Sequence, residues 1–126
     1  MSQTDKLALQ RSQAGMRFIA QTSIYNQANW PRLAQFIRES YAPVLLEERN
    51  VAERLADFQA WQAQMGRMRV KQVLASNEHH VVVALEVERE ANLYYLELQC
   101  EGDYPHLITR CWLAPLVPVE SEDEDA

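Results

Sequence analysis

The histidines are the residues of this chain whose type and placement first suggest chemistry. His79 and His80 are adjacent, and His106 follows Pro105 at the start of a run with strand-like alternation. An imidazole acts as a general base when an apolar wall tunes its pKa and a second polar group lies within hydrogen-bond reach. Adjacent strand residues point to opposite faces, so His79 and His80 cannot bind one ion together. No partner stands at a recognisable spacing from His106, and we expect its imidazole to bond backbone at the strand start rather than act as a base.

The carboxylates of the chain offer these imidazoles no partner at a recognisable spacing. Glu86, Glu88, Glu97 and Glu101 fall on strand faces or strand ends that we expect to meet solvent, and Asp57 is expected on the surface of a helix. None of them forms a recognisable pair with a histidine. The sequence therefore predicts no catalytic residues.

The cysteines indicate no metal centre. Cys100 and Cys111 form no CxxC pair, and no histidine accompanies them at the spacing of zinc ligands. In a reducing compartment, two such cysteines are typically small, buried, apolar side chains. We expect neither a metal nor a cofactor.

Aromatic side chains suggest a different chemistry, the binding of a flat apolar molecule. Tyrosine and tryptophan join an apolar body to a polar tip that can orient a ligand. The predicted ligand-binding pocket consists of Tyr25, Trp30, Tyr41, Phe58, Trp61, Tyr94 and His106. Aromatic residues at helical spacing also form ordinary core, and that interpretation stays open beside the pocket.

Three helices are predicted in the first half of the chain, which must position these residues. The first covers residues 5–26, which lack proline and repeat apolar residues at steps of three and four. Asn29 is placed to cap the second helix, which stops before Pro43. Asn50, followed three residues later by glutamate, resembles a capping box for a third helix that ends at Gly66.

Four strands are predicted after residue 66, where the apolar period changes from 3.6 to 2. Short polar links separate them, as in antiparallel hairpins, and they cover residues 67–75, 79–88, 92–100 and 106–113. The predicted core faces carry Val81, Val83, Leu85 and Val87 in the second strand and Tyr94, Leu96, Leu98 and Cys100 in the third. Helices followed by strands indicate an α+β fold with the helices on one side of an antiparallel meander.

The last strand has two mixed faces, so its register cannot be assigned from alternation alone. His106, Ile108, Arg110 and Trp112 share one face at strict period two. A bulge near Arg110 would exchange the faces beyond it. Both registers stay open at this point.

Composition describes an ordinary globular chain with an acidic end. The formal net charge is −6 over 126 residues, and five of the eighteen acidic residues fall in residues 119–126. We predict one domain over residues 1–118 and an acidic disordered tail over 119–126. Basic residues are scattered singly, which argues against nucleic-acid binding. Without an apolar run near the roughly 20 residues of a membrane span, or a secretory signal, we expect no membrane contact and a cytoplasmic location.

A family resemblance lies in three pieces of sequence, residues 18–37, 53–70 and 104–115. Their order resembles the nuclear-transport-factor-2-like superfamily, a cone-shaped cystatin-like α+β fold, and within it the small domain associated with some bacterial β-lactamase-like serine hydrolases. The resemblance implies a strongly curved four-stranded sheet, a conical pocket closed by three helices, and a homodimer through the outer sheet face. Within residues 104–115 this chain has Leu107 and Arg110, where such domains tend to carry a basic residue and a glycine.

Three functional hypotheses follow. The first is a non-catalytic domain that binds a small apolar molecule in the conical pocket or serves dimeric assembly. The second is an isomerase, dehydratase or hydrolase acting on a small apolar substrate, with His106 or Asp57 as base and Tyr25 or Tyr94 as donor. The third is a protein-binding module that presents the outer sheet face to another chain.

Overall fold

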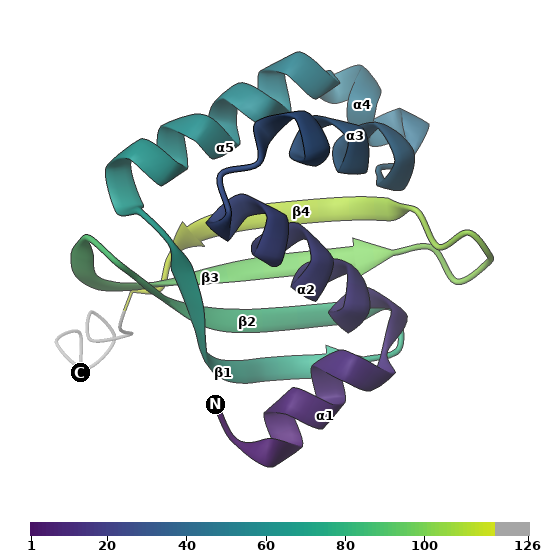
Figure 1. The fold of residues 1–126 in the computed structure, drawn as a ribbon. Coiled ribbons are helices and arrows are strands. Elements are labelled where there is room, and N and C mark those ends of the chain that lie inside the picture. Colours follow the sequence, from purple (N-terminus) through teal and green to yellow (C-terminus); the bar gives the residue numbers. More distant parts are fainter. Residues whose placement is uncertain (118–126) are drawn as a thin grey trace, which may run out of the picture.

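Helices cover one face of a four-stranded antiparallel sheet in the computed structural model, which describes residues 1–117 (Figure 1). The elements are α1 (Gln3–Arg11), α2 (Gln13–Asn26), α3 (Trp30–Ser40), α4 (Pro43–Glu48), α5 (Val51–Met65), β1 (Met68–Asn77), β2 (His80–Val87), β3 (Glu90–Cys100) and β4 (Ile108–Pro115). This order confirms the predicted α+β class and the meander β1-β2-β3-β4. The predicted tail, residues 119–126, lies outside the described residues.

The prediction of three helices is wrong, because residues 1–117 contain five. The expected first helix divides at Ser12, whose backbone is extended and whose Oγ accepts a hydrogen bond from the Gly15 N–H at 2.8 Å. Ser12 therefore ends α1 and caps α2. The expected connector after Ala42 contains the short helix α4, with Pro43 in its first turn, where a missing N–H leaves no helical bond unmade.

The predicted caps of the other two helices are confirmed. Asn29 Oδ1 accepts from the Arg32 N–H at 3.3 Å and begins α3. Asn50 and Glu53 form the reciprocal capping box of α5, with both hydrogen bonds at 2.9 Å. Gly66 ends α5 at a φ of 77°, a left-handed value that a glycine adopts without steric cost.

The inner face of the sheet carries the residues that alternation predicted. Val81, Val83 and Leu85 of β2 have no exposed surface, and Leu96 and Leu98 of β3 are likewise buried. The register of β4 is settled by a bulge, since Gln99 pairs with Arg110 while Cys100 pairs with Ile108. The bulge leaves Thr109 without a cross-strand partner and puts Ile108 and Cys111 on the same, inner face.

The two edges of the sheet are treated differently. Along β4, Tyr41 forms a parallel bridge with Ile108, and the Ala42 N–H donates to the Ile108 carbonyl at 2.8 Å. The chain before α4 thus lines the start of that edge. At the other edge, α1 runs beside β1 (Figure 1).

The contact between α1 and α2 depends on Gly15. A Cβ built there would clash with the carbonyl oxygen of Leu9 and would lie 2.6 Å from the Leu9 Cα and from the Ser12 Oγ. Leu9 itself is 1% exposed and belongs to the core. The missing side chain is what lets the end of α1 approach α2.

We expect Gly15→Ala to lower the free energy of unfolding by about 1–3 kcal/mol, because backbone must move to admit the methyl group. Urea unfolding followed by circular dichroism measures the change. Gly102→Ala is the matched control, since a Cβ at Gly102 meets nothing within 4 Å. Equal stability of the two variants would show that the α1–α2 contact is looser than described.

Candidate functional site

Four of the predicted pocket residues form one aromatic cluster between α2, α3 and α5. The ring of Tyr25 makes edge contacts with Trp30 at 6.4 Å and with Phe58 at 6.1 Å between centroids, and Phe58 makes one with Trp61 at 5.2 Å. The Tyr25 hydroxyl donates to the Gly66 carbonyl at 2.8 Å, and burial raises the pKa of Tyr25. In this arrangement the aromatic rings contact one another, and the one buried hydroxyl is bonded to backbone.

Tyr41 lies in a separate polar cluster with the buried Gln21 and the partly buried Cys111. Its hydroxyl donates to Gln21 Oε1 at 2.6 Å, and Gln21 Nε2 lies 3.4 Å from the Cys111 sulfur. The Arg54 guanidinium lies over the Tyr41 ring at 5.3 Å from its centroid. Gln21 is the member that sequence analysis missed, because a glutamine within a helical pattern is ordinarily expected on the surface.

Electrostatics keep this cluster neutral. Burial raises the pKa of Tyr41 well above its ordinary value, and burial likewise raises the pKa of the Cys111 thiol. A thiol acts as a nucleophile as its thiolate, so a raised pKa opposes that chemistry. The cluster can order the interior, and it does not activate Cys111.

The remaining sequence candidates lie apart from one another. The Tyr94 hydroxyl donates to Glu90 Oε1 at 2.6 Å. His106 lies before β4 with a φ of 57°, bonds the Glu101 carbonyl through Nδ1 at 2.9 Å, and stacks on His79 at 5.4 Å between ring centroids.

Asp57 is bound on the surface by Arg49, with oxygen–nitrogen distances of 2.8 and 2.9 Å. Tyr25 and Tyr94, the donors of the enzyme hypothesis, are bonded elsewhere, and His106 contacts neither of these two residues through a described hydrogen bond. The structure thus brings together no base–donor pair from that hypothesis. The seven-residue ligand pocket itself stays a prediction.

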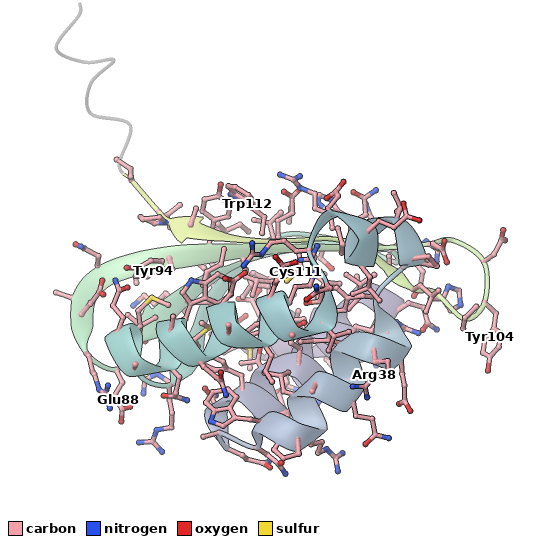
Figure 2. All side chains as sticks on the ribbon, turned by 90° about the horizontal axis from the view of Figure 1, so that it is seen from above. Arg38, Glu88, Tyr94, Tyr104, Cys111 and Trp112 are labelled. Carbon is pink, nitrogen blue, oxygen red and sulfur yellow. The ribbon has the colours of Figure 1, made fainter. Side chains whose placement is uncertain are left out.

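The face of the sheet away from the helices, called the outer face below, is covered by no described helix or strand. Figure 2 shows Trp112 on the opposite side of the sheet from the α5 and α3 helices, and Cys111 on the inner side. The outer face is formed by His80, Val82, Ala84 and Glu86 of β2, Tyr95, Glu97 and Gln99 of β3, and Arg110, Trp112 and Ala114 of β4.

An apolar stripe crosses this outer face. Ala84 pairs with Tyr95, which in turn pairs with Ala114, and Trp112 lies beside this row with 52% of its surface exposed. Ala84 is only 2% exposed although no other element covers it, so its larger neighbours on the face shield it. Large apolar residues gathered on an uncovered face are typical of an interaction surface.

Glu97 is the carboxylate that orders the polar part of the outer face. Its carboxylate is bonded to Arg110 Nε at 2.7 Å and to His80 Nε2 at 2.8 Å. The hydrogen bond from Arg110, and then that from His80, hold the pKa of Glu97 below its ordinary value. The Arg110 guanidinium also lies 5.8 Å from the centre of the Trp112 ring. These contacts order the polar half of the face without leaving a free carboxylate.

A groove of about 690 Å³ lies between α1, α2 and β1. It is lined by residues such as Leu9, Phe18, Ile19 and Met68, and by none of the seven residues of the predicted pocket. Its size falls in the range of small ligand sites, about 300–1,000 Å³. Sequence reasoning could not find this groove because the break at Ser12, which sets α1 against β1, was not predicted.

Neither a metal site nor a membrane span is described. Within residues 1–117, no group of three or more His, Cys, Asp or Glu side chains is placed to hold a metal ion. Over the same residues, no helix has both the length and the apolar character needed to cross a bilayer.

Comparison of the chain with protein-family models, with curated proteins and with solved structures finds no match. The class is therefore given by the elements alone, a two-layer α+β protein with an antiparallel meander.

We expect Tyr41→Phe to lower the free energy of unfolding by about 1–3 kcal/mol, because Gln21 Oε1 would lose its buried donor. Thermal and urea unfolding of the purified chain measure the loss. Tyr104→Phe removes the same hydroxyl from a side chain that is 89% exposed, and it should stay within about 0.5 kcal/mol of the unaltered protein. If both variants lose nothing, the buried bond contributes no net stability.

Proposed function

We propose that this chain is a non-catalytic assembly domain that forms a homodimer through the outer face of its sheet. The observation that carries the proposal is the exposed Trp112 beside Tyr95 on a face that no described element covers. Tryptophan and tyrosine are the residues most enriched among those that dominate binding energy at protein interfaces. The proposal includes membership of the nuclear-transport-factor-2-like superfamily, for which the sequence resemblance is the support, and the cytoplasmic location expected from the sequence.

A second copy of the chain is the occupant that the charges favour. Glu86 pairs with Arg69 of the neighbouring strand β1 at 2.9 Å, and Glu97 pairs with Arg110 at 2.7 Å, so each carboxylate of the face has its own cation. These two pairs sum to zero charge. A two-fold interface presents the same patch on both subunits, and a patch of zero net charge meets its copy without net repulsion.

The geometry favours assembly over catalysis. Among the described residues, every buried side-chain nitrogen and oxygen has a hydrogen-bond partner, and the candidate base–donor pairs of the enzyme hypothesis lie apart. Catalysis by general acids and bases needs two such groups aimed at one reacting atom. The outer face instead offers apolar area with a bonded polar rim, which is the usual composition of an interface.

We expect Trp112→Lys to weaken the dimer at least tenfold in Kd, because a lysine in the centre of the interface would lose its hydration. Lysine is tolerated in the folded monomer, since position 112 pairs directly with Glu97 across the strands. Sedimentation velocity over a range of micromolar concentrations measures the mass, which should be twice 14.6 kDa for the unaltered protein.

Tyr104→Lys is the matched control, because it adds the same charge at an exposed residue between β3 and β4. It should sediment like the unaltered protein. A mass of one chain for the unaltered protein at about 100 µM would refute the homodimer and leave the outer face to a different partner.

A further inference from the structure

The free edge of β1 borders the groove between α1 and α2, at the opposite edge of the sheet from Trp112 on β4. Glu86 belongs to both the groove and the outer face. Figure 1 shows α1 beside this edge strand, with α2 crossing in front of the sheet. Phe18 and Met68, both buried, belong to the apolar lining of the groove, and Ile19 at its rim is 39% exposed. The groove therefore combines an apolar wall with an accessible strand edge.

On both sides of Val70, side chains form hydrogen bonds with the backbone groups of this edge. The Asn26 amide bonds the N–H and the carbonyl of Met68, at 2.8 Å each, as a neighbouring strand would. The Asp5 carboxylate accepts from the Val73 N–H at 3.1 Å. Each of these side chains makes hydrogen bonds that a further strand would otherwise make at that position.

Val70 directs its own backbone groups to the same edge. The Arg67 carbonyl accepts a hydrogen bond from the backbone N–H of Glu88, which directly follows β2. Backbone groups alternate in direction along an antiparallel strand, so those of Arg67 and Arg69 face β2 and those of Met68 and Val70 face away from it. No hydrogen bond from residues 1–117 is described for the edge-facing groups of Val70. One donor and one acceptor are thus offered together beside the groove.

Charge around the groove is locally positive. Its lining contains Lys6, Arg69 and Lys71 and one carboxylate, Glu86, which pairs with Arg69 at 2.9 Å. Asp5, bonded to the Val73 N–H, is a second carboxylate on the same strand edge, so three cations face two carboxylates. The chain as a whole carries a formal charge of −6, so this concentration of cations is contrary to its overall sign. Such a rim favours an acidic ligand.

We propose that this groove binds an extended acidic peptide segment of a partner protein, which adds to the sheet as a short strand beside Val70. The peptide backbone accepts from the Val70 N–H and donates to the Val70 carbonyl, an apolar side chain enters between α2 and β1, and flanking carboxylates meet Lys6 and Lys71. Strand addition of this kind takes its affinity from main-chain bonds and its specificity from side-chain pockets. A fatty acid has a carboxylate but no N–H for the Val70 carbonyl.

The backbone requirement gives the proposal a sharp test on the full chain. The probe is an acetylated and amidated heptapeptide, Glu-Asp-Val-Ile-Val-Glu-Asp, titrated into isotopically labelled protein and followed by amide chemical shifts. We expect shifts confined to β1 and the facing parts of α1 and α2. The same peptide with its three central amides N-methylated should bind at least tenfold more weakly, because it cannot donate to the edge.

Charge is tested on the protein side. Lys71→Glu should weaken the probe at least tenfold, whereas Arg38→Glu, a matched reversal at an exposed residue of α3, should leave its affinity unchanged. Neither residue is buried, and circular dichroism confirms that each variant folds. A heptapeptide with lysines in place of the four acidic residues should not shift β1.

Several results would overturn the proposal. Equal affinity of the N-methylated probe would mean that side chains alone are recognised, and equal affinity of the basic probe would remove the role of the rim. Shifts that fall on the outer face would place the peptide elsewhere. Probe binding that disappears as protein concentration rises would assign the groove to a second copy of the chain. The Trp112→Lys variant should bind the probe with unchanged affinity. A failure of the peptide proposal can therefore be distinguished from a failure of the homodimer proposal.

Discussion

The packing of α2 against the inner face of the sheet is the interaction on which the rest of the molecule depends. Phe18 and Tyr25 of this helix are each 1% exposed, and they meet the buried valines and leucines of β2 and β3. Burial of that apolar area is the main favourable term in folding. Gln21 is on the same helix and bonds Tyr41, so one helix both fills the core and orders its polar interior.

Because α2 is fixed on the sheet, the other helices take their places from it. The break at Ser12 turns α1 back along α2 and beside β1, and Gly15 allows the close contact. On the other side, Trp30 of α3 and Phe58 of α5 pack on Tyr25. Both functional surfaces follow from this arrangement. Helices gathered on one face leave the outer face uncovered, and the position of α1 forms the groove.

Much of the fold could be predicted from the sequence, because its strongest signals are local. The alternation in β2 and β3, the Asn29 cap and the Asn50 capping box each depend on residues within a few positions of one another. The sequence could not show whether β4 contains the bulge at Thr109, since the bulge depends on pairing with β3. Ser12 was missed because a serine inside an apolar helical pattern can point to solvent or cap a new helix, and only the structure shows that its Oγ accepts from the Gly15 N–H.

The lining of the β4 edge by Tyr41 and Ala42 has a consequence for how copies of this chain can associate. A fibril that grows by joining sheets edge to edge needs two free strand edges on every subunit, one for each neighbour. Here the margin at β4 is partly occupied by the chain itself, and the margin at β1 is interrupted by Asn26 and Asp5. Both edges of the sheet are therefore interrupted, which opposes indefinite growth.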